Sequence, residues 1–382
     1  MHDWIKSRFI ELIGNIQNPK YPLVELNEIC EFIKDGTHQT PIYTEDRVNG
    51  FKFLSSKDVT SQKINWTNIK YIQKELHEQL YAKLSPKRGD ILLAKNGTTG
   101  VAAVVDSDEI FDIYVSLALL RPKSGVNVSY LCSALNSEDL KRQFNSSLKG
   151  IGVPNLHLRE IKKARIIFPP IDIQNKISSI TKQIDKSKFL LQQILEKFEL
   201  LKKSRFIEMF KNSETLRLDQ IAEVTMGQSP DSSSYNSVGK GIPFYQGKTE
   251  FTDKYIGQPS TWCTSPTRIA KENDILMSVR APVGNVNIAT EECCIGRGLS
   301  SIRPQNGFNS EFIFEALEQK KEELENKATG STFKAINKDI VLSIQIPNTS
   351  ISIQKEYSNF VKQIDKSKLI IQKALEDLVG KV

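Results

Sequence analysis

The chain has 382 residues, 39% of them hydrophobic and 25% charged, and a net charge of +7. These values are typical of a globular protein with two or three domains, and no apolar run approaches the roughly 20 residues that a membrane-spanning helix requires. Charged residues in its first turns make the N-terminus unlike a signal peptide. The five scattered cysteines form no C-x-x-C pair, which favours reduced thiols, a cytoplasmic location and no metal site.

Residues 1–16 are predicted to form a short N-terminal helix, because Trp4, Phe9, Leu12 and Ile13 are spaced to share one buried face. Residues 17–170 are predicted to form a first globular domain of short strands and turns. Asn96-Gly97 lies between two apolar runs, which indicates a β-hairpin. Strands are expected at residues 51–54, 89–95, 101–105 and 115–120, and a helix at Tyr130–Phe144.

Residues 171–211 are predicted to form one long helix, since no Pro or Gly interrupts them after Pro170. The apolar residues from Ile173 to Phe210 step by four and three, as in a heptad, and these 38 residues would make a rod about 57 Å long. A second predicted helix, at residues 351–382, repeats this pattern in phase. The expected seam residues are Ile173, Ile177, Ile180, Ile184, Leu191, Ile194, Phe198 and Leu201 in the first helix, and Ile353, Tyr357, Phe360, Ile364, Ile371 and Leu378 in the second.

The positive charge is concentrated around the first long helix. Between Ile161 and Lys211 the chain carries twelve Lys or Arg and five Asp or Glu, so this segment holds the whole net excess. A basic stripe of this kind fits a polyanionic partner, although a solvated coiled-coil flank explains it equally well.

Residues 212–350 are predicted to form a second globular domain built like the first. Its strand and turn landmarks follow in the same order, while the sequence between them differs. Residues 182–188 recur identically as residues 362–368, which indicates an internal duplication. Residues 7–13 nearly repeat residues 204–210, so the duplication is cyclic, and residues 1–16 are expected to complete the distal end of the coiled coil.

Sequence motifs of the common DNA-modifying and nucleotide-binding enzymes are missing. The segment Gly241–Thr249 has five residues between its glycines where a P-loop has four, and Ile242-Pro243 lies where the loop would wrap phosphate. The chain has no Asn-Pro-Pro-Tyr element, which an adenine methyltransferase would carry. It also has no glycine-rich loop for S-adenosylmethionine. The four histidines are far apart in sequence. We therefore expect no catalytic residues.

Taken together, the two half-alike domains, the two repeated heptad helices and the Gly89–Leu92 and Asn273–Leu276 strands resemble the specificity subunit of type I restriction–modification systems. The loop Gly330–Ile336, which leads to Ile346-Pro347, adds to the resemblance. The resemblance covers essentially the whole chain. It implies an α+β (mixed α/β) fold, in which two similar target-recognition domains are separated by a long antiparallel two-helix coiled coil with a pseudo-twofold cyclic repeat.

The resemblance also implies a function. Each domain would read one half of a bipartite double-stranded DNA target, and the coiled coil would set the spacer and dock methyltransferase subunits, two of them being expected, with endonuclease/translocase subunits able to join. The chain itself would bind no cofactor, because S-adenosylmethionine, ATP and Mg²⁺ would belong to the partner subunits that methylate adenine N6 or cut DNA.

Base contacts are expected from polar side chains on glycine-bounded turns, since Arg and Lys suit guanine while Asn and Gln suit adenine. The candidates in the first domain are Thr37, His38, Ser55, Ser56, Lys57, Lys95, Asn96, Thr98 and Thr99. Those in the second domain are Gln228, Ser229, Tyr245, Gln246, Lys248, Arg280, Arg297 and Lys334.

Two other functions compete with this interpretation. A stand-alone DNA methyltransferase or nuclease would need the motifs that are missing. A coiled-coil scaffold that never binds DNA explains the helices, but it does not explain why two similar frames differ in their loops.

Overall fold

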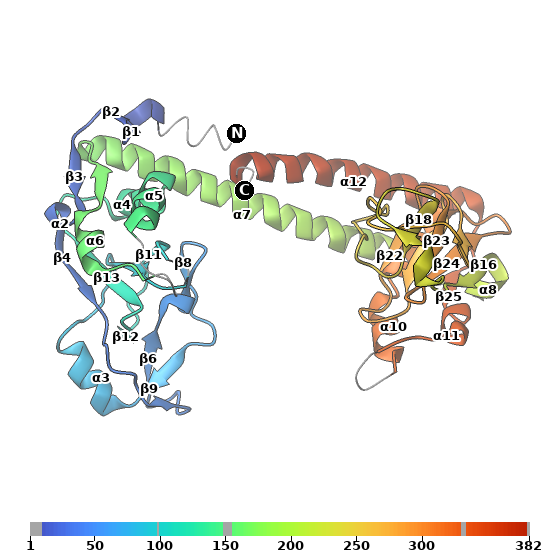
Figure 1. Ribbon diagram of the computed structural model, residues 1–382, viewed down its shortest axis with the longest axis horizontal. Helices are drawn as coiled ribbons and strands as arrows, with labels where there is room; N and C mark the ends of the chain where they lie inside the picture. The colour runs from blue at the N-terminus through green and yellow to red at the C-terminus, as the bar shows by residue number, and fades with distance from the viewer. Residues whose placement is uncertain (1–9, 98, 148–154, 330–333, 380–382) are drawn as a thin grey trace. The chain divides into compact units, whose positions relative to one another are not determined.

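The computed structural model describes residues 10–97, 99–147, 155–329 and 334–379 (Figure 1). The chain divides into two compact units, one of residues 1–191 with 374–382 and one of residues 192–373. Among the described residues, no helix combines the length and the apolar character needed to cross a membrane.

The first unit is built around a four-stranded antiparallel sheet in the order β11-β10-β13-β4. These strands are β11 (Ala102–Val104), β10 (Ile91–Ala94), β13 (Leu117–Pro122) and β4 (Cys30–Asp35). Successive side chains of β10 alternate between two cores, because Ile91 and Leu93 face one apolar cluster while Leu92 and Ala94 face another. Burial on both faces explains why β10 reads as an unbroken apolar run.

A second sheet of the first unit has the order β12-β6-β9-β5, in which β12 and β6 are parallel. Its strands are β12 (Phe111–Ile113), β6 (Phe51–Leu54), β9 (Lys70–Ile72) and β5 (Tyr43–Thr44). The other elements are β1 (Gly14–Asn15), β2 (Asn18–Pro19), β3 (Leu23–Glu25), α2 (Leu26–Ile29), η1 (Ser56–Asp58), β7 (Val59–Thr60), β8 (Lys63–Ile64), α3 (Lys74–Tyr81), α4 (Val128–Leu135), α5 (Glu138–Ser147), α6 (Leu158–Lys163) and β14 (Arg165–Ile167).

The second unit repeats this plan. Its antiparallel sheet has the order β16-β24-β21-β22, the same sequence of equivalent strands, and β18 pairs in parallel with β23 as β6 does with β12. The elements are β15 (Thr215–Arg217), α8 (Leu218–Ile221), β16 (Ala222–Met226), η2 (Ser232–Ser234), β17 (Tyr235–Asn236), β18 (Ile242–Tyr245), β19 (Trp262–Cys263), β20 (Ile269–Ala270), β21 (Ile275–Ser278), β22 (Val286–Ile288), β23 (Cys293–Ile295), β24 (Leu299–Pro304), α9 (Ser310–Glu318), α10 (Lys321–Lys327), α11 (Lys338–Leu342) and β25 (Gln345–Pro347).

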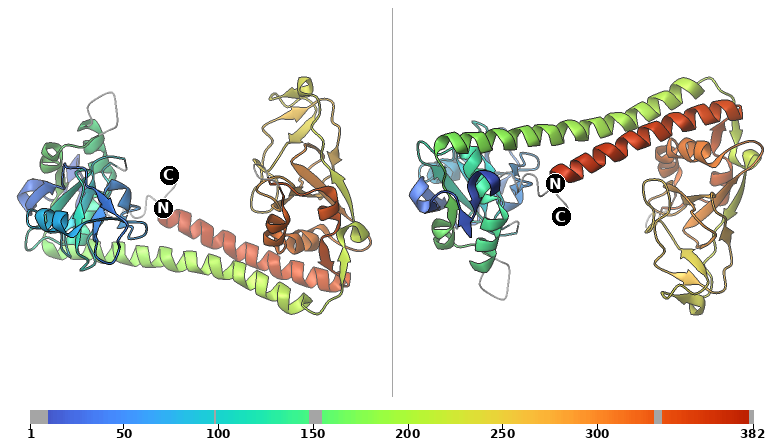
Figure 2. Two further views of the ribbon diagram at one scale, coloured as in Figure 1. Left: turned by 90° about the horizontal axis from the view of Figure 1, so that it is seen from below. Right: turned by 90° about the horizontal axis from the view of Figure 1, so that it is seen from above.

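The two long helices are α7 (Ile171–Phe210) and α12 (Ile351–Val379). Within the second unit, α12 lies alongside the C-terminal part of α7 (Figures 1 and 2). The two helices run antiparallel there, because Arg205 pairs with Glu356 at 3.3 Å while Lys368, further along α12, pairs with the earlier Glu199. The expected antiparallel pairing is thus present in this unit.

Each long helix is attached to its own domain by a buried glutamine in its first turn. The Gln174 side chain accepts a hydrogen bond from the Asn127 amide at 3.0 Å and donates to the Pro169 carbonyl at 2.8 Å. Gln354 accepts from the Asn309 amide at 3.1 Å in the same way. Asn127 and Asn309 are the N-caps of α4 and α9. The apolar heptad pattern does not predict this repeated contact, because the residue that makes it is a glutamine.

The Gly-Asp and Asn-Asp strand starts hold equivalent ion pairs, each between a buried aspartate and a half-buried arginine. Asp90 accepts two hydrogen bonds from Arg121 at 2.8 Å, and Asp274 accepts two from Arg303 at 2.9 and 2.8 Å. The residue before each aspartate has a positive φ, +89° at Gly89 and +68° at Asn273. After Gly, Asn is among the residues that tolerate a positive φ best. Asn273, which stands where the first repeat has Gly89, therefore leaves the loop shape intact.

The prediction of one helix over residues 1–16 is wrong at its C-terminal end. Residues 10–13 are helical, but the β1–β2 hairpin begins at Gly14, where φ is +78°. Trp4 and Phe9 lie outside the described residues, so their expected contacts with the coiled coil are not tested. Ile13 joins the apolar cluster that contains Tyr130 and Ile177, as Phe210 joins the one that contains Phe312 and Tyr357.

The predicted helix Tyr130–Phe144 is in fact two helices, α4 and α5. Asn136 ends the first of them, because its side-chain amide donates to the Cys132 carbonyl at 2.9 Å and its oxygen accepts from the Ala102 amide at 3.0 Å. A side chain that bonds to neighbouring backbone competes with the helical ladder in this way.

The heptad seam is buried in part. Ile177, Ile184, Tyr357 and Ile364 are buried as expected. Ile194, Leu201 and Ile353 are 38%, 47% and 40% exposed, so the prediction of a continuous buried seam is wrong at these positions. Two paired helices bury only the side of each helix that faces the other. At the start of α12, the globular domain buries Gln354, and the neighbouring Ile353 stays exposed.

Candidate nucleic-acid interface

In the first unit, three of the candidate segments meet along one edge, held by a fourth segment, residues 114–116. The Val115 amide donates to the Thr37 carbonyl at 2.9 Å. The Ser56 amide donates to the Ser116 hydroxyl at 3.0 Å, and the Lys95 amide to the Ser116 carbonyl at 2.8 Å. Residues 36–38, 54–57 and 95–97 are therefore neighbours, and the segment that joins them was not among the residues selected from the sequence. We call this the first edge.

The side chains of the first edge differ in what they present to solvent. His38 and Lys57 are exposed, while Thr37, Ser56, Asn96 and Thr99 are half-buried. The Ser55 hydroxyl makes a local hydrogen bond, which it donates to the Asp58 carboxylate at 3.0 Å. Thr98 lies outside the described residues.

Lys95 lies beneath the first edge and not on it. Its side chain is 5% exposed, and its ammonium group donates to the Asp35 carboxylate at 2.6 Å. Asp35 also lies 3.7 Å from the His38 imidazole. A buried, paired lysine at the end of β10 supports the turn that carries Asn96, and Asp35 is a residue that sequence analysis did not single out.

In the second unit, equivalent segments form a second edge, in which the Gln228–Ile295 and Val279–Gly298 backbone bonds repeat the Thr37–Ile113 and Lys95–Ser116 bonds of the first. The Gln228 amide donates to Ile295, the Val279 amide to Gly298, and the Gly298 amide to Gln246, at 3.0, 2.9 and 3.2 Å. The Ala281 amide donates to the Lys334 carbonyl at 2.9 Å, which adds Lys334 to the group. Gly227 is needed for this packing, because a Cβ there would lie 2.2 Å from the Gly296 carbonyl, as one at Gly36 would lie 2.1 Å from that of Ile113.

The second edge presents more cationic side chains than the first. Arg280 and Arg297 are exposed on adjoining turns, and no ion pair occupies either side chain in the described parts of the chain. The other exposed members are Gln228, Gln246, Lys248 and Lys334, while Ser229 is half-buried. Two guanidinium groups beside amide side chains can hydrogen-bond base edges and phosphates.

Tyr245 does not present its hydroxyl on the second edge. The residue is 1% exposed, and its hydroxyl donates to the Gly257 carbonyl at 3.1 Å. Burial raises the pKa of this phenol well above its ordinary value. Tyr245 thus packs beneath the edge, as Lys95 does in the first unit.

A metal centre finds no support in the described parts of the chain, where no three His, Cys, Asp or Glu side chains gather as potential ligands. His77 is buried and hydrogen-bonded to Asp112 at 2.7 Å, while His38 is exposed. The two edges present hydroxyl, amide, imidazole and cationic side chains.

Known proteins resemble both halves of the chain. The model of the type I restriction modification DNA specificity domain matches twice, over residues 19–200 and 211–379. A putative type I restriction enzyme specificity subunit, MjaX of Methanocaldococcus jannaschii, is 32% identical and is matched over 93% of this chain and 91% of its own length. A second subunit of that organism, MjaIX, is 25% identical over 41% of this chain and 38% of its own length.

Solved structures agree. A chain described in a study of complex assembly and conformational transition of the type I R-M system is matched over 94% of this chain and 95% of that one, with a TM-score of 0.69 and 25% identity. The HsdS subunit from Thermoanaerobacter tengcongensis gives a TM-score of 0.51 with 25% identity over 94% of both chains. On the strength of the doubled family match and the full-length relative, this chain belongs to the specificity subunits of type I restriction–modification systems.

Proposed function

We propose that this chain is the DNA-reading subunit of a type I restriction–modification complex, with each edge reading one half of a bipartite target. The observation that carries the proposal is the pair of edges, which share one backbone frame and differ in their side chains. Thr37, Asn96 and Val115 of the first edge correspond to Gln228, Arg280 and Arg297 of the second. A common frame with different side chains is what two readers of different sequences require.

The proposal keeps the division predicted from sequence. Residues 17–170 and 212–350 are the two target-recognition domains, and residues 171–211 and 351–382 are the helices whose length sets the unread spacer. The residues before the β1–β2 hairpin, 1–13, then complete the distal coiled coil. Ten base pairs of DNA rise about 34 Å, so a rod of the predicted length is sufficient to hold two readers more than one helical turn apart.

The chain is non-catalytic in this proposal and needs no cofactor of its own. Methyl transfer from S-adenosylmethionine, and ATP- and Mg²⁺-dependent cleavage, belong to the methyltransferase and endonuclease subunits that assemble with it. The proposed location is the cytoplasm, which fits five cysteines that are all free and buried.

The test is selection from randomised duplex DNA by the chain together with its methyltransferase partner. We expect a two-part sequence with a fixed spacer to be recovered. The chain alone should transfer no methyl group and cut no DNA. Methylation or cleavage that follows the pure polypeptide would favour the stand-alone enzyme, and recovery of no preferred sequence would favour the scaffold.

The docking surface for the methyltransferase subunits is proposed to be a repeated apolar pair on the two helices. Phe189 and Leu190 on α7 are 58% and 46% exposed, and Leu369 and Ile370 on α12 are 66% and 70% exposed. Each pair directly follows one copy of the identical seven-residue repeat. Large apolar side chains exposed at equivalent positions of a duplicated chain fit two copies of one partner.

Replacing one pair by serines, Phe189→Ser with Leu190→Ser or Leu369→Ser with Ile370→Ser, is expected to lower the bound methyltransferase from two copies to one. Native mass spectrometry of the assembled complex measures the stoichiometry. Leu200→Ser is the matched control, because Leu200 is 63% exposed on α7 but follows no copy of the repeat. Two bound copies with either double variant would contradict the docking surface.

A further inference from the structure

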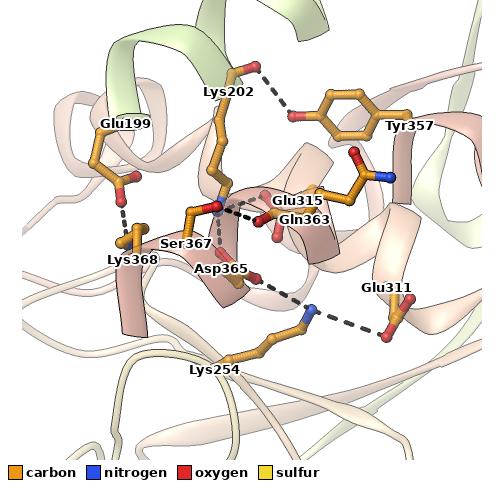
Figure 3. A network of polar contacts seen from close by, with 10 residues as sticks. All are labelled: Glu199, Lys202, Lys254, Glu311, Glu315, Tyr357, Gln363, Asp365, Ser367 and Lys368. Atoms are coloured by element: carbon orange, nitrogen blue, oxygen red, sulfur yellow. Dashed lines mark hydrogen bonds and ion pairs between the residues drawn. The ribbon is translucent and has the colours of Figure 1, made fainter. Parts of the chain in front are cut away.

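A cluster of charged side chains lies between the long helices and the second recognition domain (Figure 3). Lys202 of α7 is 13% exposed, and its ammonium group lies 3.3 Å from the Glu315 carboxylate of α9 and 3.6 Å from the Asp365 carboxylate of α12. A single cation thus joins both long helices to a helix of the globular domain. We call Lys202, Glu315 and Asp365 the charged latch.

A second cation extends the latch into a loop of the domain. The Lys254 ammonium group lies 3.8 Å from Asp365 and 3.9 Å from Glu311 of α9. Glu311 also pairs with Lys362 of α12 at 2.9 Å. On the other side, the Tyr357 hydroxyl donates to the Lys202 carbonyl at 3.2 Å. The network therefore fixes α9 and one loop against two helices at several points.

The latch stands in a place where charge is costly. Glu315 is 2% exposed, and one of its carboxylate oxygens has no hydrogen-bond partner. Burial raises the pKa of Glu315, although Lys202 and Lys254 oppose the shift. Buried ion pairs seldom add stability over apolar residues of similar size, so they are more readily explained by the geometry that they impose.

The first repeat carries different residues at the positions of the latch. The residues equivalent to Glu315 and Glu311 are Ser133 and Ser129, where the Ser133 hydroxyl donates to the Ser129 carbonyl at 2.9 Å. The position equivalent to Lys202 is Ile5 in sequence. In the described part of the first unit, no ion pair joins α4 to α7, and Gln174 and Asn175 make polar contacts with the cap of α4.

We propose that Lys202, Glu315 and Asp365 are positioning residues that fix the orientation of the second recognition domain on the two helices, and so restrict the spacer lengths that the complex accepts. The inference rests on the proposed function. Arg280 and Arg297 would set which bases the second domain reads, whereas the latch sets where along the duplex it reads them. The asymmetry implies that the second domain, and not the first, carries this restriction.

The test separates position from stability. Lys202→Met and Glu315→Leu are made singly and together, because replacing both partners by apolar residues removes the buried charges without leaving one unpaired. Binding of the methyltransferase complex is measured on DNAs that keep both half-sites and vary the spacer by one and two base pairs. The double variant should melt near the wild-type temperature, yet its preference for the correct spacer should fall about tenfold, the effect of a pair coupling of ordinary size.

Two controls complete the experiment. Lys202→Arg keeps the charge and should keep the spacer preference, and Ser133→Leu, at the equivalent position of the first repeat, should do the same. A double variant that folds and selects the spacer as sharply as the wild type overturns the latch but leaves the proposed function standing. A wild-type complex without any spacer preference overturns both. If the apolar pair does not fold, Lys202→Gln with Glu315→Gln is read by the same criteria.

Discussion

Replacing Arg280 and Arg297 by alanine is expected to weaken binding of the full target by about 30-fold or more, from two contacts of about 1–3 kcal/mol each, and to relax selectivity in the second half-site only. Both side chains are exposed on the second edge and neither forms an ion pair with another described residue, so the domain should fold normally. A bidentate arginine contact contributes about 1–3 kcal/mol of discrimination against the wrong base. Binding is measured on DNAs in which one half-site at a time is scrambled.

The matched change in the first domain is Lys57→Ala with Asn96→Ala, which should relax the first half-site and spare the second. Lys95 is left in place, because its buried pair with Asp35 is part of the fold. Lys211→Ala with Lys355→Ala removes two exposed charges from the long-helix segments, which contribute no residue to the second edge, and controls for loss of net charge. Equal relaxation of both half-sites by either recognition variant would contradict two independent readers. If the variant instead lost affinity equally for all DNA sequences, and its affinity depended less steeply on salt concentration, the arginines would be assigned to phosphate contacts.

The architecture could be predicted from the sequence because it depends on local and repeated signals. The heptads of the two long helices, the apolar run of β10 and the Asn96-Gly97 turn each fix an element through its own residues. The duplication then supplied a second copy of every landmark. The boundary between α4 and α5 could not be predicted, because Asn136, which ends α4, bonds to Ala102 on strand β11.

The candidate edges could be grouped from sequence, but the orientation of single side chains could not. Polar residues that directly follow a buried strand must lie at the end of that strand. This is where Asn96 lies after β10 and Arg280 after β21. Whether a neighbour turns inward depends on partners brought by strand pairing. Lys95 is buried because β4 and β13 pair and carry Asp35 to it, and nothing near Lys95 in sequence announces that contact.

The charged latch was missed for a related reason. Lys202, Glu315 and Asp365 lie on three helices, and each alone looks like a solvated charge. One local signal was available, because Glu315 lies within the otherwise apolar run Phe312–Leu317 of a short helix, where a carboxylate is expected to have a cationic partner. Identifying Lys202 as that partner requires the fold.

Lys202→Met alone is expected to lower the free energy of unfolding by about 3–5 kcal/mol at neutral pH, because it leaves a buried carboxylate without its counter-charge. Among the described residues, Lys202 is the one cation that forms an ion pair with Glu315. Asp365 keeps a second partner in Lys254, so the loss is concentrated at Glu315. Lys203→Met is the control, since that neighbour is exposed and should change stability by no more than about 0.5 kcal/mol.

The deficit of Lys202→Met should shrink as the pH falls. Burial raises the pKa of Glu315 above its ordinary value of 4.5, with Asp365 adding to the rise and Lys202 and Lys254 opposing it. For a carboxyl whose pKa is raised on folding, the stabilising contribution is complete below the ordinary value and is lost as the pH rises through the folded one. Removing Lys202 raises that folded pKa further, so the buried group can be neutral at mildly acidic pH. Urea unfolding at about pH 5 and pH 7 measures the difference, and a deficit that is the same at both would show that Glu315 does not cause it.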